Sequence, residues 1–220
     1  LKLNKHNKIG LWGIENSNLI WNNATRQIFF TFGFKINLVL KKDNPMLVFS
    51  KNNRPVLLSK LTSDEYVQLE SYLHNLSTDT KNRFGPHPFN LQAITDFYHS
   101  NNQITGYIAR NMEDQSIIAY SIIKTGYLEH DSFRLQPYGL HLSHETDCTF
   151  APSVTDAWQS KGIGNSLFLY ILKNLQSSGF KRIILWGGVQ SGNEKAVQFY
   201  KKHGFSLLGG FEYNGPNYDM

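Results

Sequence analysis

The sequence has little cysteine and no long apolar run, and both absences narrow the class of protein. Its 220 residues include one cysteine, Cys148, which cannot form a disulfide within the chain and fits a reducing cytoplasm. The longest strongly apolar run, residues 28–34, is interrupted by Thr31 and Gly33 and is far shorter than the roughly 20 residues of a membrane span. Residues 1–10 are rich in Lys and Asn and lack the pattern of a secretory signal. We therefore expect a cytoplasmic protein without a membrane span.

Acidic residues are scarce in the first quarter of the chain. Residues 1–60 hold ten Lys or Arg against two acids, Glu15 and Asp43, which gives this segment a net charge of +8. The remaining residues hold 12 basic and 15 acidic side chains, a net charge of −3. The overall charge of +5 therefore does not describe an evenly basic protein, and a nucleic acid partner is not expected. An electrostatic docking surface for a macromolecule would have to lie in the first quarter.

Two regions of the chain differ in pattern. Residues 1–54 alternate short apolar runs with Asn, Gly and Pro breaks, and these runs are typical of strands joined by turns. The runs are GLWGI, LIW, QIFFTFGFKINLVL and MLVFS. We predict a basic, strand-rich N-terminal extension over residues 1–54 and one α/β domain over residues 55–220.

Helical and strand patterns alternate through residues 55–220. Thr62 to Glu65 has the form of a capping box at a helix start, and Gly179 is a typical helix stop. The expected elements, in chain order, are a strand at 55–61, helices at 62–76 and 91–98, strands at 104–110 and 116–127 around a hairpin turn at 111–114, a polar link at 128–140, an extended stretch at 141–155, a helix from 162 to 178, a buried strand at 182–186, a helix at 193–203, and strands at 206–213 and 217–220. This order predicts a mixed α/β sheet with helices on both faces.

The sequence WQSKGIGN, residues 158–165, places two glycines at the start of the clearest helical pattern. A glycine-rich turn that leads into a helix offers backbone N–H groups to a phosphate. A P-loop would need Gly-x-x-x-x-Gly-Lys-Ser/Thr, which is absent. A dinucleotide fingerprint would need a third glycine where Leu167 stands, and no repeated strand-helix-strand unit follows. What remains is a Gln-x-x-Gly-x-Gly loop between a strand and a helix, or glycines that only permit a tight turn.

A second motif follows the loop at a defined distance. Asn193-x-x-Ala-x-x-Phe-Tyr-x-x-x-Gly-Phe205 comes after the apolar run at 182–186. The loop, the apolar strand and this motif, in this order and spacing, resemble the GNAT superfamily of N-acetyltransferases. The resemblance covers about residues 55–220 by element order and is carried by residues 156–205. It implies a mostly antiparallel central sheet with a V-shaped split between two central strands, and acetyl-CoA as the co-substrate.

By this resemblance, the loop and the following helix bind the pyrophosphate of coenzyme A. N–H groups at a helix start and the positive end of the helix dipole both favour an anion, and glycine lets it approach without a Cβ. The strand before the loop would diverge from the next strand and let the pantetheine arm pair with its backbone. Pro152 cannot donate a ladder hydrogen bond and fits such a break. The implied cofactor-binding residues are Val154, Thr155, Gln159, Ser160, Lys161, Gly162, Ile163, Gly164, Asn165, Asn193 and Phe199.

Acetyl transfer to an amine needs a neutral amine, a hydrogen-bond donor to the oxyanion and an acid for the departing thiolate. The resemblance implies that Tyr200 is this acid, since a phenol with a pKa near 10 is protonated at pH 7. The alternative for Tyr200 is core packing beside Phe199. A backbone N–H near Val154 is the implied oxyanion donor, and Asn193 either contacts the cofactor or caps its helix.

Candidates for the general base lie at residues 144–148, on the expected strand before the loop. Family members often have a carboxylate on this strand, but the aligned position carries Cys148. Strand alternation puts Glu145 and Asp147 on one face and His144 with Cys148 on the other. Glu145 is the candidate base. The alternatives are a bulge near Pro152 that shifts the register, a water relay, or no base.

Two further groups of residues bear on ligands. His141 and His144 point to opposite faces of a strand because they are three residues apart, and we expect no metal site. The Pro-rich loop after the first helix lies where the family usually shapes its acceptor pocket, and it alternatively carries only solvated side chains. The implied acceptor contacts are Arg83, Phe84 and His87.

The leading hypothesis is an acetyl-CoA-dependent N-acetyltransferase that acetylates the primary amine of a small molecule by direct attack in a ternary complex. The first alternative is a protein or peptide N-acetyltransferase that docks its acceptor on the basic segment 1–54. That segment alternatively packs as strands on the domain or on a second copy of the chain in a homodimer. The second alternative is a non-catalytic acyl-CoA sensor, since the aligned carboxylate is missing.

Overall fold

The computed structural model describes residues 21–22, 27–29, 35–36, 44–176 and 178–220. The chain divides into two compact units, Leu1–Lys42 and Asp43–Met220. In the first unit, the described residues form a small antiparallel sheet in the order β1-β2-β3, with strands Trp21–Asn22, Gln27–Phe29 and Lys35–Ile36. In this unit, the described strands overlap two of the expected runs, the run LIW only at Trp21, whereas the run GLWGI lies outside the described residues.

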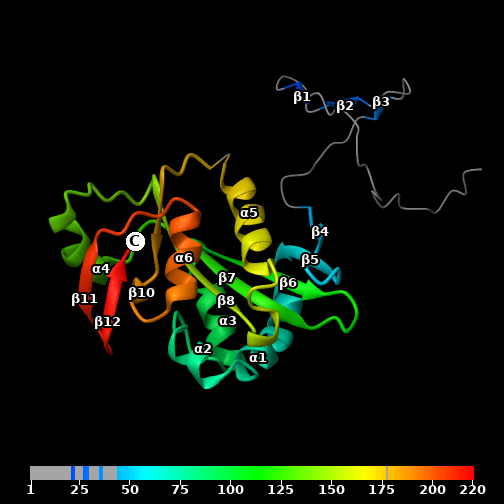
Figure 1. Cartoon of the computed structure of the whole chain (residues 1–220), viewed down its shortest axis with the longest axis horizontal. Helices are drawn as coiled ribbons and strands as arrows, with labels where there is room; N and C mark the ends of the chain where they lie inside the picture. Colours follow the sequence, from blue (N-terminus) through cyan, green and yellow to red (C-terminus); the bar gives the residue numbers. More distant parts are fainter. Residues whose placement is uncertain (1–20, 23–26, 30–34, 37–43, 177) are drawn as a thin grey trace, which may run out of the picture. The chain divides into compact units, whose positions relative to one another are not determined.

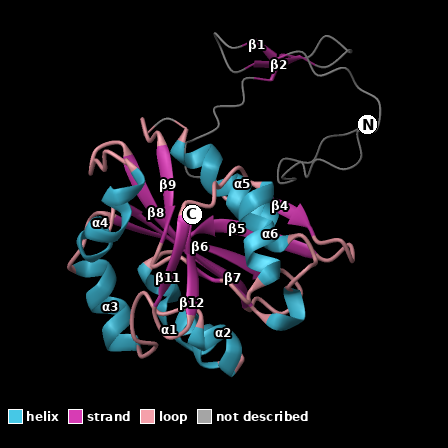
Figure 2. Ribbon diagram, turned by 60° about the vertical axis from the view of Figure 1, so that its left-hand side comes forward, coloured by secondary structure: helices cyan, strands magenta, loops and turns pink. Residues whose placement is uncertain are grey.

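The second unit is built on a six-stranded sheet (Figures 1 and 2). Neighbouring strands are antiparallel, except that β8 and β9 are parallel. In sheet order the strands are β4 (Met46–Phe49), β5 (Pro55–Lys60), β6 (Ile104–Asn111), β7 (Ile117–Thr125), β8 (Asp147–Val154) and β9 (Arg182–Leu185). A smaller antiparallel sheet contains, in order, β10 (Val189–Gln190), β12 (Pro216–Asp219) and β11 (Gly209–Glu212). The predicted mixed, mostly antiparallel sheet is confirmed.

Helices cover both faces of the large sheet, and each face has its own apolar core (Figure 1). Successive residues of a strand point to opposite faces, so Tyr107 and Ala109 of β6 enter one core and Ile108 enters the other. The first core packs under α5 (Ile163–Leu175) and α6 (Glu194–Lys202), and the second packs under α1 (Tyr66–His74) and α3 (Leu91–His99). The hairpin between β6 and β7 and these four helices agree with the sequence prediction. Among the described residues, no helix is long and apolar enough to cross a membrane.

Several boundaries differ from the prediction. The strand β4 pairs with β5, so residues 46–54 continue the large sheet and do not belong to an extension. A short helix, α2 (Thr78–Asn82), precedes the Pro-rich loop. The expected polar link contains α4 (Glu129–Leu135), with acids in its first turn and Arg134 in its last, which complement the helix dipole. Arg134 also stacks on Phe211 of β11, with its guanidinium carbon 3.8 Å from the ring centre, a tertiary contact that the local pattern does not encode.

Candidate active site

The strands β8 and β9 separate partway along their length. They pair from Asp147 to Phe150 of β8, and the N–H of Trp186 then donates to the carbonyl of Phe150 at 2.9 Å. Gly187 and Gly188 follow with φ of 65° and 75° and turn the chain away from β8, which continues to Val154. The last residues of β8 therefore have a partner strand only on the β7 side, and this is the split implied by the sequence.

The backbone of Val154 points into this split. On the β7 side, the N–H of Thr155 donates to the carbonyl of Ile118 at 3.0 Å. Because backbone groups of successive residues face opposite neighbours, those of Val154 and Pro152 face the split. Pro152 has no N–H to leave unpaired there. The N–H of Val154 is the donor that the open edge presents.

The loop after β8 ends in a set of unpaired amides. Ser160 and Gly162 have left-handed φ of 60° and 89°, and the first bond of the helix joins the N–H of Ser166 to the carbonyl of Gly162 at 3.0 Å. None of the N–H groups of residues 160–165 hydrogen-bonds to another described residue. The first turn of α5 carries no acidic side chain, and Gly162, its N-cap, makes no side-chain cap. An ordinary helix start leaves four N–H groups unpaired. Here the unpaired groups already begin in the loop, at residue 160, so the loop enlarges a site suited to an anion.

Two side chains join the loop to the end of the strand. Gln159 Nε2 donates to the carbonyl of Val154 at 3.2 Å and to Asp156 Oδ1 at 2.8 Å. Thr155 Oγ1 donates to the carbonyl of Ile118 at 3.2 Å. The sequence assigned Gln159 and Thr155 to cofactor contacts, and in the structure both side chains bond within the protein.

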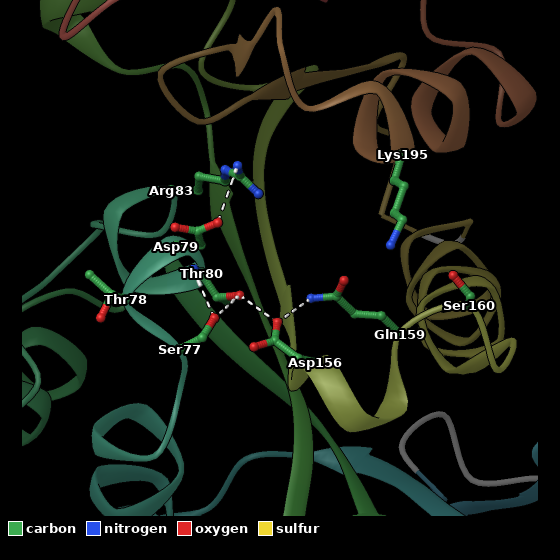
Figure 3. Close-up of a pocket in the computed structure, with 9 residues that line it drawn as sticks. All are labelled: Ser77, Thr78, Asp79, Thr80, Arg83, Asp156, Gln159, Ser160 and Lys195. Atoms are coloured by element: carbon green, nitrogen blue, oxygen red, sulfur yellow. Dashed lines mark hydrogen bonds and ion pairs between the residues drawn. The ribbon is translucent and has the colours of Figure 1, made fainter.

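A polar cavity of about 580 Å³ opens beside the loop (Figure 3). Thr80 Oγ1 donates to Asp156 Oδ1 at 3.0 Å, so α2 is tied to the loop along one side. In Figure 3, Lys195 and Ser160 lie across the cavity from Arg83 and Asp79. The lining residues are Ser77, Thr78, Asp79, Thr80, Arg83, Asp156, Gln159, Ser160 and Lys195. Of these, the sequence singled out Arg83, Gln159 and Ser160. Lys195 lies two residues after Asn193, within the second motif, so the sequence could have pointed to it. The residues of α2 belong to no motif in the sequence.

Tyr200 lies on the buried face of α6, within a cluster of aromatic side chains. Its ring centre is 5.4 Å from that of Phe199 and 5.3 Å from that of Phe205. Burial raises the pKa of the phenol well above its usual value of 10, and no described residue hydrogen-bonds to the hydroxyl. Asn193 is the N-cap of α6, and its side chain accepts from the N–H of Ala196 at 3.3 Å.

The expectation that residues 144 and 145 lie on the strand is wrong. The side chain of Ser143 accepts from the N–H groups of Glu145 and Thr146 and closes a turn, so β8 begins only at Asp147. Glu145 is exposed in this turn, beyond the end of an extended strand whose length puts Val154 roughly 23 Å from Asp147. This placement gives Glu145 no support as the general base.

The two residues that follow this turn are buried and paired. Asp147 is fully buried and forms an ion pair with Arg182, with 3.3 Å between Oδ1 and Nε. Burial raises the pKa of the Cys148 thiol to about 12. The start of β8 therefore supplies neither a free carboxylate nor a thiolate. Among the described residues, no group of three His, Cys, Asp or Glu side chains is arranged to hold a metal ion.

The three implied acceptor contacts are not together. Arg83 is exposed at the cavity, and its Nε donates to Gln190 Oε1 at 3.2 Å. Phe84 and His87 are only 4% and 6% exposed. Phe84 belongs to the apolar core under α1 and α3, and His87 packs against it. The carbonyl of Pro88 can only accept, so His87 Nδ1 donates to it at 2.7 Å and Nε2 accepts from the hydroxyl of Tyr120 at 3.0 Å. His87 is therefore a core residue, so the solvated alternative is wrong for it and its burial gives the acceptor role no support.

An open sheet edge thus lies beside a helix start whose unpaired N–H groups suit an anion, an arrangement that could hold a phosphorylated carrier along one strand. A model of the acetyltransferase (GNAT) family matches residues 69–205. This is more than half of the chain, and the protein belongs to the GNAT family of acetyltransferases. Transfer of an acetyl group from acetyl-CoA is general to this family. A comparison with curated proteins finds no match.

Solved structures agree in fold. The GNAT domain of PAT from S. lividans has a TM-score of 0.61 and 17% identity, over 80% of this chain and 97% of that one. The ribosomal-protein-S5-alanine acetyltransferase from Vibrio fischeri has a TM-score of 0.58 and 15% identity, over 80% and 93%. The GNAT acetyltransferase from Streptococcus pneumoniae has a TM-score of 0.55 and 18% identity, over 74% and 95%. At these identities the likeness shows the fold alone.

Proposed function

We propose that the protein transfers the acetyl group of acetyl-CoA to the primary amine of a small molecule, by direct attack in a ternary complex. The observation that carries this proposal is the run of unpaired N–H groups at residues 160–165, directly after the strand end at Val154. The loop amides suit a pyrophosphate, and the open edge of β8 suits the amide groups of a pantetheine arm.

Two groups of the chain would act on the reacting atoms. The N–H of Val154 donates to the thioester oxygen as negative charge develops on it, a type of contact worth roughly 3–4 kcal/mol in other enzymes. The hydroxyl of Tyr200 gives its proton to the departing sulfur. Burial raises the pKa of the phenol, and the same apolar surroundings raise that of a thiol, so the proton transfer stays feasible. No buried carboxylate serves as base in this scheme, and water in the open cavity takes the proton of the amine.

The cavity supports a small acceptor. Its volume of about 580 Å³ lies in the range of small-molecule sites. Asp79 and Asp156 can attract an ammonium group, while Arg83 and Lys195 can hold an acidic group of the same molecule. A protein acceptor is the competing outcome, since the Vibrio fischeri enzyme is described as acting on a ribosomal protein.

The test is release of free thiol from acetyl-CoA in the presence of small amines, amino acids and N-terminal peptides. Turnover with a small amine, lost in Tyr200→Phe and kept in Tyr213→Phe, supports the proposal. Tyr213 is a suitable control because it is 70% exposed, away from the core. Turnover only with peptides would replace the proposed acceptor, and binding of acetyl-CoA without turnover on any class would favour a sensor.

A further inference from the structure

The short helix α2 forms one wall of the polar cavity, and burial does not hold it there. None of its five described residues, Thr78–Asn82, is buried. The chain is anchored on either side of the helix by Leu76 and Phe84, which belong to the apolar core under α1 and α3. A helix this short is not stable by itself. Polar contacts must therefore fix the side that α2 turns to the cavity.

A chain of hydrogen bonds joins α2 to the end of β8. Ser77, the N-cap of α2, donates from Oγ to Thr80 Oγ1 at 3.1 Å, and Thr80 Oγ1 donates to Asp156 Oδ1 at 3.0 Å (Figure 3). Gln159 Nε2 donates to the same oxygen at 2.8 Å and to the carbonyl of Val154 at 3.2 Å. These contacts form the Asp156 bridge between the helix and the strand.

The chemistry of the groups fixes the direction of every bond in the Asp156 bridge. A carboxylate oxygen only accepts, so Thr80 must donate to Asp156, and its own oxygen is left to accept from Ser77. The amide nitrogen of Gln159 carries two hydrogens, one for Asp156 and one for the carbonyl of Val154. The bridge therefore holds one position of α2 relative to the strand end.

The two ends of the Asp156 bridge lie on the two sides of the proposed reaction. Val154 is the last residue of β8, and its N–H is the proposed donor to the thioester oxygen. Thr80 lines the cavity that is proposed for the amine. Lys81 and Arg83 bond elsewhere, to the carbonyl of His74 in α1 and to Gln190 in β10. The contact of Thr80 with Asp156 is therefore the one that sets α2 against the donor side.

The geometry points to Asp156 as a positioning residue of acetyl transfer, which holds α2 and the amine beside it against the thioester; this inference rests on the proposed function. Asp156 has two separable properties. Its Oδ1 holds the bridge, and its charge can attract the ammonium group of the acceptor. Reaction between two bound molecules is sensitive to displacements of about 1 Å, so a loosened α2 should slow the transfer even when both molecules bind.

The test is steady-state transfer by the full chain from acetyl-CoA to the small amine that gives turnover in the thiol-release assay. Thr80→Val removes the hydroxyl that donates to Asp156 and leaves the charge of Asp156 in place. We expect kcat to fall about fivefold while KM for acetyl-CoA stays within about twofold. Thr95→Val is the matched control in α3, because its hydroxyl donates within its own helix, to the carbonyl of Leu91 at 2.9 Å. It should keep the wild-type constants.

Two substitutions of Asp156 separate its hydrogen bonds from its charge. The side-chain oxygen of asparagine can accept the same two hydrogen bonds, so Asp156→Asn should keep kcat within about twofold and raise only KM for the amine. Asp156→Ala should lower kcat at least as far as Thr80→Val does. Adding Thr80→Val to Asp156→Ala should have no further effect, because the hydroxyl then has no partner to lose.

Hydrogen–deuterium exchange reports how firmly α2 is held, without any acceptor. Residues 77–83 should exchange faster in Thr80→Val and Asp156→Ala than in the wild type, and at the wild-type rate in Asp156→Asn and Thr95→Val. Wild-type exchange or wild-type kcat in Thr80→Val would overturn the inference and leave the proposed function standing. Losses that add in the double variant would do the same. If the wild type transfers to no small amine, the proposed function fails, and the inference fails with it.

Discussion

Replacing Gly162 and Gly164 separately by alanine should change the free energy of unfolding in opposite directions. Gly162 has a φ of 89°, where a Cβ costs roughly 1–2 kcal/mol. Gly164 is helical, and a Cβ there would meet Val154 Cγ2 at 3.7 Å and Phe199 Cε2 at 3.8 Å, which are ordinary contacts. Alanine at a compatible helical position stabilises a protein by roughly 0.4–1 kcal/mol over glycine. The same methyl group, two residues apart, should therefore separate the variants by roughly 1.5–3 kcal/mol.

Urea unfolding followed by tryptophan fluorescence measures this difference, provided that the slope is the same for both variants. The midpoint should fall for Gly162→Ala and rise for Gly164→Ala, and thermal midpoints should move by roughly 2–4 °C for each kcal/mol. The affinity for coenzyme A should fall in Gly162→Ala, because a change of φ at residue 162 turns the neighbouring N–H groups of the loop in another direction. It should stay unchanged in Gly164→Ala, because the added methyl group points to Val154 and Phe199. Equal destabilisation of both variants would refute the loop conformation on which the site is built.

Three other predictions follow from burial. Tyr200→Phe should lower kcat about 100-fold or more with little change in KM for acetyl-CoA, and a wild-type rate that declines between pH 7 and 9 through deprotonation of Tyr200 would contradict the raised pKa of its phenol. Cys148 should not react with a thiol reagent in the folded protein at pH 8, because burial raises its pKa to about 12, and should react fully in urea; stoichiometric labelling of the native protein would show that the thiol is accessible. Burial lowers the pKa of His87 from 6.5, so as the pH falls the unfolded chain takes up this proton before the folded protein does, and the free energy of unfolding should fall below pH 6.5. In urea titrations, His87→Phe should show a smaller loss of stability at low pH than the wild type. An equal loss would assign it to another group, first of all His203, whose pKa is also lowered.

The parts of the fold that the sequence predicted correctly are those whose signal is local. The helix α5 has its start, apolar face and stop within residues 162–179, and the hairpin between β6 and β7 has its turn at 111–114 between two apolar runs. The helix α4 was missed because it buries only Asp131 and Leu135 and is held in place by partners far along the chain, such as Phe211. The turn before β8 was missed because the Ser143 side chain, rather than a glycine or a proline, closes it.

The candidate site divides in the same way, and the division has a chemical reason. In the proposed site, the donor side uses backbone N–H groups, whose direction is fixed by a short pattern of glycines and a helix start, so residues 159–165 could be proposed without a structure. The proposed acceptor side uses side chains from α2, from the loop after β8 and from α6, and their meeting depends on how the helices pack. Phe84 and His87 were assigned to it from their place in the chain, but the second core takes both of them, and Arg83, the next residue upstream, remains at the cavity. In the proposed site, donor recognition thus depends on local conformation and acceptor recognition on tertiary packing.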